Sequence, residues 1–348
     1  MKFRYLLITL GGLFMASCHN PVYEDEGDCD VAYNLRFVYD MNLKWADAFP
    51  SEVHSVRVYV YDSEGLFVKE IRDAGPALAE PGYSLRLDLK PGDYTFVAWC
   101  GLDNEDVKTE SFTVSEPVAG VSTLNDLTCS LNTVKQDGNV ISRERLNFLY
   151  HGNIEASLPD SQDGKDYYYT IPLIKDTNHI RVILQQLSAE NMIASDYEFS
   201  IDAQDEAMAW DNSLIGDINV EYLPWAQATV SAGIGSPDED SSEGIVYADG
   251  VYADLSTARL MASQQDSVFL YIKNSATGES IAKIPVLQYA LLSRSYYEEA
   301  YGHIMTPQEF LDREDEYVMT FFLDRNGAWI SSVVEINSWR IVIHDYDM

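Results

Sequence analysis

Large apolar residues alternate with polar or small residues along most of the chain, and a period of two is typical of half-buried β-strands. Residues 31–39 and 83–89 follow this pattern most regularly. Residues 56–61 and 66–71 are predicted as two further strands, and residues 62–65 between them, with the sequence Asp-Ser-Glu-Gly, predict a hairpin turn. Further strands are predicted over residues 94–100, 111–114, 127–131, 146–150 and 154–158.

The pattern breaks at residues 158–166, where Pro159 and Gly164 stand among acidic and polar residues. A chain of 348 residues suggests about two domains. We therefore predict a first domain over residues 31–160 and a second over residues 161–348. Strands of the second are expected at 167–174, 180–187, 197–201, 253–261, 268–273, 281–288, 317–323, 333–336 and 339–344, with a partly helical segment at 289–311. Short strands in two halves predict an all-β fold of two antiparallel β-sandwiches in tandem.

The amino terminus has the form of a secretory signal. Lys2 and Arg4 precede an apolar run over residues 5–15, shorter than the ~20 residues that span a bilayer. Small residues then stand directly before Cys18, which resembles a bacterial lipobox. We predict a signal over residues 1–17 and acylation of the Cys18 sulfur, because several acyl chains on one cysteine would form a lasting anchor. The alternative is an ordinary secreted protein whose signal contains a cysteine.

Residues 18–30 contain Pro21, Gly27 and five acidic residues but no Lys or Arg, which predicts a flexible acidic tether. An acidic stretch just behind a lipidated cysteine resembles the export signal that sends some bacterial lipoproteins to the cell surface. We expect a lipid-anchored protein of the outer membrane, exposed on the surface. A solvated linker facing the periplasm is the alternative.

The net charge is −33, with 23 Lys and Arg against 56 Asp and Glu, and no basic cluster occurs. This charge excludes a nucleic-acid binder and electrostatic attachment to an anionic membrane. The six histidines show no metal-ligand spacing, and no nucleophile elbow or phosphate-binding loop is present. The acidic loop around Asp238 could hold Ca²⁺, but a solvated charge run explains it better. We expect no enzyme activity, cofactor or metal.

Three cysteines remain after Cys18, which allows one internal disulfide in an oxidising compartment. Cys100 ends a predicted strand and Cys129 lies inside another. We favour a bridge between these two, while a pairing of Cys29 with either stays open.

Several segments, in order, resemble the FimB-type anchor subunits of bacterial type V fimbriae. The most specific is the block from Asp40 to Phe49. The others are residues 37–39, 56–62 with Gly65, 89–94 with Trp99, 149–152, 173–182 and 336–339. The resemblance implies two transthyretin-like β-sandwich domains, no enzymatic activity, and a role in holding the fimbrial shaft to the outer membrane. Residues 216–250 match no part of that pattern.

In shaft (pilin) subunits of such fimbriae, the resemblance implies an Arg-specific cut that removes the first strand and opens a groove for a neighbour's strand. From His19 to Leu35 this chain has no Lys or Arg. The first basic residue, Arg36, lies inside the predicted first strand, where backbone pairing should hinder proteolysis. We therefore expect a subunit that keeps its lipid and its first strand, and terminates assembly.

The shaft contact is predicted to be strand addition at an exposed sheet edge. The candidate is the carboxy-terminal strand with Trp339, Ile341 and Ile343, and the alternative is an ordinary internal strand. Two other functions stay open. One is a surface lipoprotein that binds glycan through aromatic faces, and the other is a tip or stalk subunit of the same fimbriae.

Overall fold

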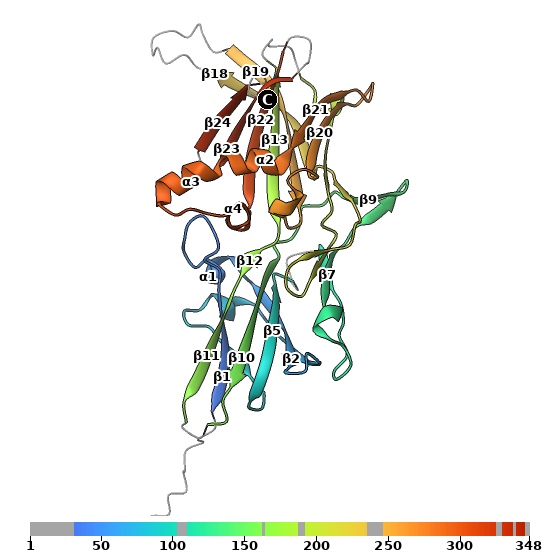
Figure 1. The fold of residues 1–348 in the computed structure, drawn as a ribbon. Helices are drawn as coiled ribbons and strands as arrows, with labels where there is room; N and C mark the ends of the chain where they lie inside the picture. The colour runs from blue at the N-terminus through green and yellow to red at the C-terminus, as the bar shows by residue number, and fades with distance from the viewer. Residues whose placement is uncertain are drawn as a thin grey trace, which may run out of the picture.

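The computed structural model describes residues 31–102, 110–161, 164–186, 192–234, 246–324, 329–336 and 339–344. The molecule is elongated, with a lower lobe built mainly from β1 to β5, α1 and β10 to β12, and an upper lobe that carries α2, α3 and α4 (Figure 1). Strands dominate both lobes, as the alternating pattern predicts.

Two sheets face each other in the first sandwich. One has the order β11 (Asp166–Pro172), β1 (Ala32–Val38), β4 (Leu85–Leu87). The other has the order β12 (Ile174–Lys175), β10 (Tyr150–Leu158), β5 (Gly92–Cys100), β2 (Ser55–Asp62), β3 (Phe67–Ala74). Buried side chains from both sheets form one core between them, among them Leu35, Val58, Phe96 and Ile171.

The first sandwich extends further along the chain than the predicted boundary at residue 160. β11 pairs with β1 from Ala32 opposite Asp166 to Val38 opposite Pro172, and β12 pairs with β10. The Pro- and Gly-containing break is therefore a connection within one sandwich, and the second domain begins near β13 (Asn178–Gln186).

Three more sheets make up the rest of the described chain. The first has the order β18 (Ala226–Ile234), β19 (Val246–Thr257), β13, β22 (Glu316–Leu323), β23 (Trp329–Ile336), β24 (Trp339–His344). The second has the order β21 (Ser280–Pro285), β20 (Phe269–Asn274), β14 (Tyr197–Ala203), β17 (Val220–Tyr222), β9 (Asn139–Ser142), β8 (Val134–Gln136). The third has the order β16 (Leu214–Ile215), β15 (Ala207–Ala209), β7 (Thr128–Leu131), β6 (Phe112–Val114).

Most neighbouring strands run antiparallel, as predicted, but three pairs run parallel: β1 with β11, β13 with β22, and β17 with β9. Each joins segments far apart in the sequence. Strands β6 to β9 belong to the predicted first domain, yet they pair with β15 and β17 of the second. The chain between β5 and β10 therefore leaves the first sandwich and adds its strands to sheets of the second domain.

Helices are short. They are α1 (Phe49–Glu52), α2 (Val286–Leu292), α3 (Arg294–Tyr301) and α4 (Pro307–Arg313), and the last three confirm the helical prediction for residues 289–311. Single 3₁₀ turns occur at Pro76–Ala79, Leu124–Asp126, Ala194–Asp196 and Ala262–Gln264. Within the described ranges, every helix is too short or too polar to cross a membrane.

Strands β2 and β5 are buried on both faces. Val58, Phe96 and Cys100 face the core of the first sandwich, whereas Tyr59 and Trp99 belong to a second core on the other face. Double-sided burial explains why these strands are almost continuously apolar instead of alternating.

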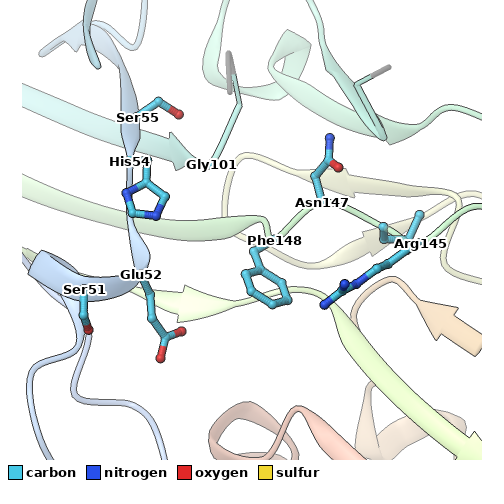
Figure 2. A pocket seen from close by; sticks show the side chains of 9 residues that line it. Ser51, Glu52, His54, Ser55, Gly101, Arg145, Asn147 and Phe148 are labelled. Atoms are coloured by element: carbon cyan, nitrogen blue, oxygen red, sulfur yellow. The ribbon is translucent and has the colours of Figure 1, made fainter. Parts of the chain in front are cut away.

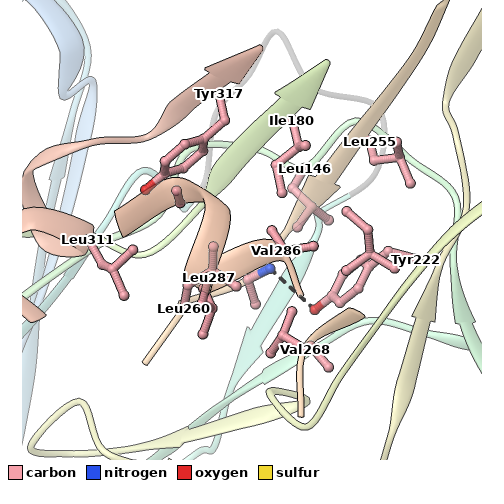
Figure 3. Close-up of a cluster of buried hydrophobic side chains, with 14 of the residues drawn as sticks. Leu146, Ile180, Tyr222, Leu255, Leu260, Val268, Val286, Leu287, Leu311 and Tyr317 are labelled. Atoms are coloured by element: carbon pink, nitrogen blue, oxygen red, sulfur yellow. Dashed lines mark hydrogen bonds between the residues drawn. The ribbon is translucent and has the colours of Figure 1, made fainter. Parts of the chain in front are cut away.

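The second core continues upward between the sheets of the second domain. Tyr222 is wholly buried there, and its hydroxyl accepts a hydrogen bond from the Ala258 amide at 3.2 Å (Figure 3). The same hydroxyl donates to Asp205 Oδ1 at 2.7 Å. Because Asp205 is almost fully buried, desolvation raises the pKa of its carboxyl to about 7.

Candidate assembly interface

The first described strand, β1, occupies the middle of its sheet. β11 pairs with one edge over seven residues and β4 pairs with the other. Tyr33, Leu35 and Phe37 point into the core, and the Leu35 side chain is wholly buried. Removing this strand would open a long groove between β11 and β4, lined by the core. In this chain the groove is filled by the chain's own first strand.

Arg36 lies within that strand, opposite Thr170 of β11. Its side chain is exposed, and the guanidinium carbon lies 3.9 Å from the centre of the Tyr168 ring. A protease must draw its substrate into an extended, unpaired form, and here the backbone on both sides of Arg36 is hydrogen-bonded to neighbouring strands. The side chain is accessible but the peptide bond is protected.

The chain from Tyr39 to Phe49, which holds the most specific block of the family resemblance, is a loop held by its own side chains. Asp47 Oδ1 accepts hydrogen bonds from the amides of Tyr39 and Phe49, both at 3.0 Å. Asn42 Nδ2 donates to the carbonyls of Tyr39 at 2.9 Å and Ala46 at 2.7 Å. These bonds replace the sheet pairing that the loop lacks, so its shape is fixed.

This loop contacts the second domain through Arg313, the last residue of α4. Arg313 Nη1 donates to the carbonyl oxygens of Asp40 at 3.1 Å and Asn42 at 3.3 Å. Its Nε donates to Glu309 Oε1 at 3.1 Å, one turn earlier on α4, and the guanidinium lies over the Trp45 ring. The guanidinium is thus shared between the two domains.

A second cation bridges the domains beside the first. Lys175, at the end of β12, forms an ion pair with Asp315 and lies 3.6 Å from Glu52 Oε2. Its ammonium also lies 3.6 Å from the centre of the Phe148 ring. The Lys175 side chain is almost fully buried, which makes these contacts stronger than the same pairs would be in water.

A third contact at the junction is deeply buried. Asp176 Oδ1 accepts from Asn212 Nδ2 at 2.8 Å and lies 3.7 Å from Arg259 Nε. Arg259 also donates to the Asn212 carbonyl at 2.7 Å and to Asp312 Oδ1 at 3.0 Å. Burial raises the pKa of the Asp176 carboxyl to about 7, and the nearby Arg259 charge opposes that rise.

Three of the segments that carry the family resemblance therefore meet at the domain junction, namely residues 40–49, 149–152 and 173–182. His151 belongs to this group, since its Nε2 lies 2.9 Å from the Trp210 carbonyl and its ring packs 4.5 Å from Trp99. Sequence reasoning did not single out Arg259 or Arg313. The available signal was weak: both are basic residues in a strongly acidic chain, and only Arg259 has apolar neighbours on both sides.

The carboxy-terminal strand lies at the edge of its six-stranded sheet. β24 pairs with β23 from Trp339 opposite Ile336 to His344 opposite Ser331. No partner pairs with its other side among the described residues. The positions of Trp339, Ile341 and Ile343 are thus on a strand that lies at a sheet edge in the described part of the chain.

A cleft of about 400 Å³ opens beside the junction, lined by Ser51, Glu52, His54, Ser55, Gly101, Arg145, Leu146, Asn147 and Phe148. The Phe148 ring stands at its centre, with Glu52 and Arg145 on either side in this view (Figure 2). An aromatic face flanked by charged and amide groups is a composition that can bind a sugar ring.

Cys100 and Cys129 are both free and buried, so the predicted bridge between them is not formed. Cys100 belongs to the core of the first sandwich and Cys129 to the second core, on the other face of β5. The sheet separates the two thiols, which sequence could not reveal. Desolvation raises the pKa of both thiols, which disfavours the thiolate form.

Other predicted positions, namely Cys18, Cys29 and the Asp238 loop, lie outside the described residues. Within the ranges that the structure describes, no three or more His, Cys, Asp or Glu side chains are grouped so that they could hold a metal ion.

Comparison with known proteins gives a consistent result. The family model of the fimbrillin-A associated anchor proteins Mfa1 and Mfa2 matches residues 25–345. The minor fimbrium anchoring subunit Mfa2 of Porphyromonas gingivalis is 24% identical over 197 residues, which are 54% of this chain and 57% of that protein. The match thus spans little more than half of that relative.

Solved structures share the fold over nearly the whole chain. A proposed adhesin from Bacteroides thetaiotaomicron has a TM-score of 0.75 at 33% identity, covering 90% of this chain and 97% of that one. A proposed polysaccharide-binding protein of the same organism has a TM-score of 0.73 at 26% identity, covering 92% and 100%. The fimbrial anchor protein Mfa2 of P. gingivalis has a TM-score of 0.60 at 17% identity, covering 90% and 99%, and shows the fold alone.

The fold is that of fimbrial anchor subunits and related surface adhesins. The chain belongs to the family of fimbrillin-A associated anchor proteins Mfa1 and Mfa2.

Proposed function

We propose that this chain is a lipid-anchored surface subunit that attaches the fimbrial shaft to the outer membrane, ends its assembly there, and acts mechanically without catalysis. The observation that carries the proposal is the position of β1, paired on both edges and joined to the core through Leu35. A subunit that retains this strand offers no open groove to a neighbour. It also keeps the covalent path from Cys18 to the first sandwich.

The domain junction supports the mechanical role. A load applied to the second domain must pass to the first before it reaches the lipid. Arg313, Lys175 and the buried Arg259–Asp176 pair connect the two domains at three neighbouring places. The chain between β5 and β10 adds to these contacts, because its strands β7 and β9 pair with β15 and β17 of the second domain.

Deleting the gene and complementing it tests the anchoring role. Cells without the chain should shed intact fimbriae into the medium, and the wild-type gene should restore attachment. A Cys18→Ala variant should not restore it, although the soluble protein should still fold. Fimbriae that stay attached to cells carrying Cys18→Ala would contradict the proposal. Protease treatment of whole cells tests surface exposure, since a protected chain would contradict it.

We infer further that the shaft subunit is bound by strand addition at the free edge of β24. An edge strand offers unpaired backbone donors and acceptors to another strand. β24 lies in the upper lobe and β1 in the lower lobe (Figure 1), so a shaft bound at β24 would be remote from the tether. Such a position suits a subunit that joins a membrane on one side and a fibre on the other.

Two proline variants at neighbouring positions test this contact. Successive residues of a strand direct their N–H groups to opposite sides, so Ile341→Pro and Val342→Pro remove one inner and one outer donor. One variant should have a lower melting temperature because it breaks pairing with β23. The other should fold as the wild type does, yet release the fimbriae. Normal attachment with both variants would exclude this edge.

Glycan binding is the second candidate, and the cleft around Phe148 favours it. The description of one similar structure as a proposed polysaccharide-binding protein points in the same direction. Binding to a glycan array that is lost in Phe148→Ala, with fimbriae still attached in that variant, would support this function. Loss of fimbrial attachment without any glycan binding would support the anchor.

A further inference from the structure

The loop that connects β6 to β7 contains a short exposed apolar turn at residues 118–121. Val118 is 59% exposed and Val121 is 69% exposed, and Ala119 and Gly120 between them are exposed as well. Four consecutive exposed residues without a polar side chain are unusual on a chain with a net charge of −33. The turn is called the Val118–Val121 tip below.

The tip lies at the end of the first sandwich where β1 begins. The Phe67 amide donates to the Ser122 carbonyl, and the Gly120 amide donates to the Phe67 carbonyl, both at 2.8 Å. Phe67 begins β3, beside the end of β2, and Asp62 of β2 lies opposite Tyr94 near the start of β5. Figure 1 shows this connection reaching down from β7 toward that end of the lobe.

The start of β1 is tied to the same end. β10 ends at Leu158, opposite Gly92 at the start of β5. The Tyr33 hydroxyl donates to the Pro159 carbonyl, directly after β10. The apolar tip and the point where the tether joins the sandwich therefore share one end of the molecule.

Several backbone groups of the tip are paired by hydrogen bonds. The Val121 and Ser122 amides donate to the Val118 carbonyl at 3.1 and 2.9 Å. The Val118 amide donates to Ser122 Oγ at 2.9 Å, and the Gly120 amide is bonded to Phe67. The main obstacle for a loop that enters an apolar layer is the free-energy cost of removing unpaired backbone polar groups from water. Backbone groups that are already paired cost little to transfer.

The base of the tip is also rigid. Asp126 Oδ2 accepts from the Thr123 amide at 2.7 Å and from the Thr123 hydroxyl at 2.9 Å, which forms a capping box on the following 3₁₀ turn. The turn is thus preformed and loses little conformational freedom when it binds.

We propose that the Val118–Val121 tip contacts the lipid surface of the membrane to which the chain is anchored. The inference rests on the proposed acylation of Cys18. The 13 residues from Cys18 to Asp30 reach roughly 45 Å at most, so the tip stays close to the lipid and its contact becomes intramolecular. The contact is apolar, because Glu64 and Glu116 nearby would be repelled by an anionic surface.

Lipid quenching of a fluorophore tests the contact. The acylated full chain is reconstituted into phosphatidylcholine vesicles that contain acyl-chain spin-labelled lipid, in a Cys29→Ser background. Buried Cys100 and Cys129 do not react with the label. A probe on Val121→Cys should be quenched several-fold more than one on Ile304→Cys, an 85% exposed apolar residue of the second domain. Both residues are exposed, so neither substitution disturbs a core.

Flotation with the vesicles separates the two proposals. Protein that floats with equal, weak quenching at both positions would overturn the lipid contact while leaving the anchor intact. Protein that does not float would overturn both. As a second variant, Val118→Asp combined with Val121→Asp should float normally and should reduce the quenching of a probe on Ala119→Cys several-fold.

Discussion

The guanidinium carbon of Arg313 lies 3.7 Å from the centre of the Trp45 indole ring, which joins the last residue of α4 to the loop that follows β1. Trp45 adopts a positive φ of 53°, a conformation that side-chain-bearing residues seldom take. His303 packs edge-on against the other part of the ring, 5.1 Å away. The backbone of the loop therefore has an unfavourable conformation at Trp45, the residue whose ring contacts the second domain.

Replacing Trp45 should weaken the junction. Trp45→Ala removes the aromatic face under Arg313 and should lower the free energy of unfolding by about 1–2 kcal/mol. Trp45→Phe keeps an aromatic ring and is the matched control, with a smaller loss. Urea unfolding at constant m-value measures both changes. Equal stability of the Ala and Phe variants would show that the ring does not hold the domains together.

The buried pair between Arg259 and Asp176 should be sensitive to removal of one partner. Arg259→Leu leaves Asp176 and Asp312 without their cation and should cost about 3–5 kcal/mol of stability near neutral pH. Adding Asp176→Asn should recover part of that loss, because it removes one of the uncompensated carboxylates. Additive effects of the two substitutions would mean that these side chains do not interact.

Asp205 should make stability depend on pH. Burial raises the pKa of its carboxyl to about 7 from an ordinary value of 3.8. At pH values between these two, the carboxyl keeps its proton in the native state but loses it in the unfolded chain. The group therefore destabilises the fold increasingly as the pH rises from about 4 to about 7, and fully above that.

Asp205→Asn removes this dependence while keeping an oxygen for the Tyr222 hydroxyl. The variant should be more stable than wild type by about 1–2 kcal/mol at pH 8, with the difference vanishing near pH 4. His151, whose pKa is lowered to about 4 by burial, acts in the opposite direction but cancels in this comparison. Exposed Asp217→Asn is the control. A stability difference that does not change with pH would be inconsistent with a buried, titrating Asp205.

Gly152 should tolerate no side chain. A Cβ atom there would come within 2.2 Å of the Pro172 carbonyl oxygen, so β10 and the chain after β11 would have to separate. Gly152→Ala should lower the free energy of unfolding by about 1–3 kcal/mol, against little change for the neighbouring Asn153→Ala. Thermal unfolding of the two variants decides the matter. A Gly152→Ala protein as stable as the wild type would contradict this prediction, because it would show that the two backbone segments can move apart at little cost.

Sequence predicted the elements whose pattern is local. The hairpin of β2 and β3, the alternation of β1 and the helical segment after residue 288 are all confirmed. The chain gave no such signal for β8, because all three of its residues are exposed and no apolar face marks it.

Contacts between distant parts of the chain could not be predicted from the sequence, for a different reason. The parallel pairing of β1 with β11 joins residues more than a hundred positions apart, and the loop at Pro159 looks the same within a domain as between domains. Likewise, the role of Arg313 depends on the carbonyls of Asp40 and Asn42, which only the folded chain brings to it. The family resemblance indicated which segments matter, but only the structure shows that residues 40–49, 149–152 and 173–182 meet at one junction.

The amino-terminal peptide of the mature protein, purified from outer membranes and analysed by mass spectrometry, tests the central claim most directly. The account predicts an acylated peptide that begins at Cys18 and continues without interruption through Arg36 into β1. A mature chain that begins near Tyr39, without lipid and without its first strand, would contradict it.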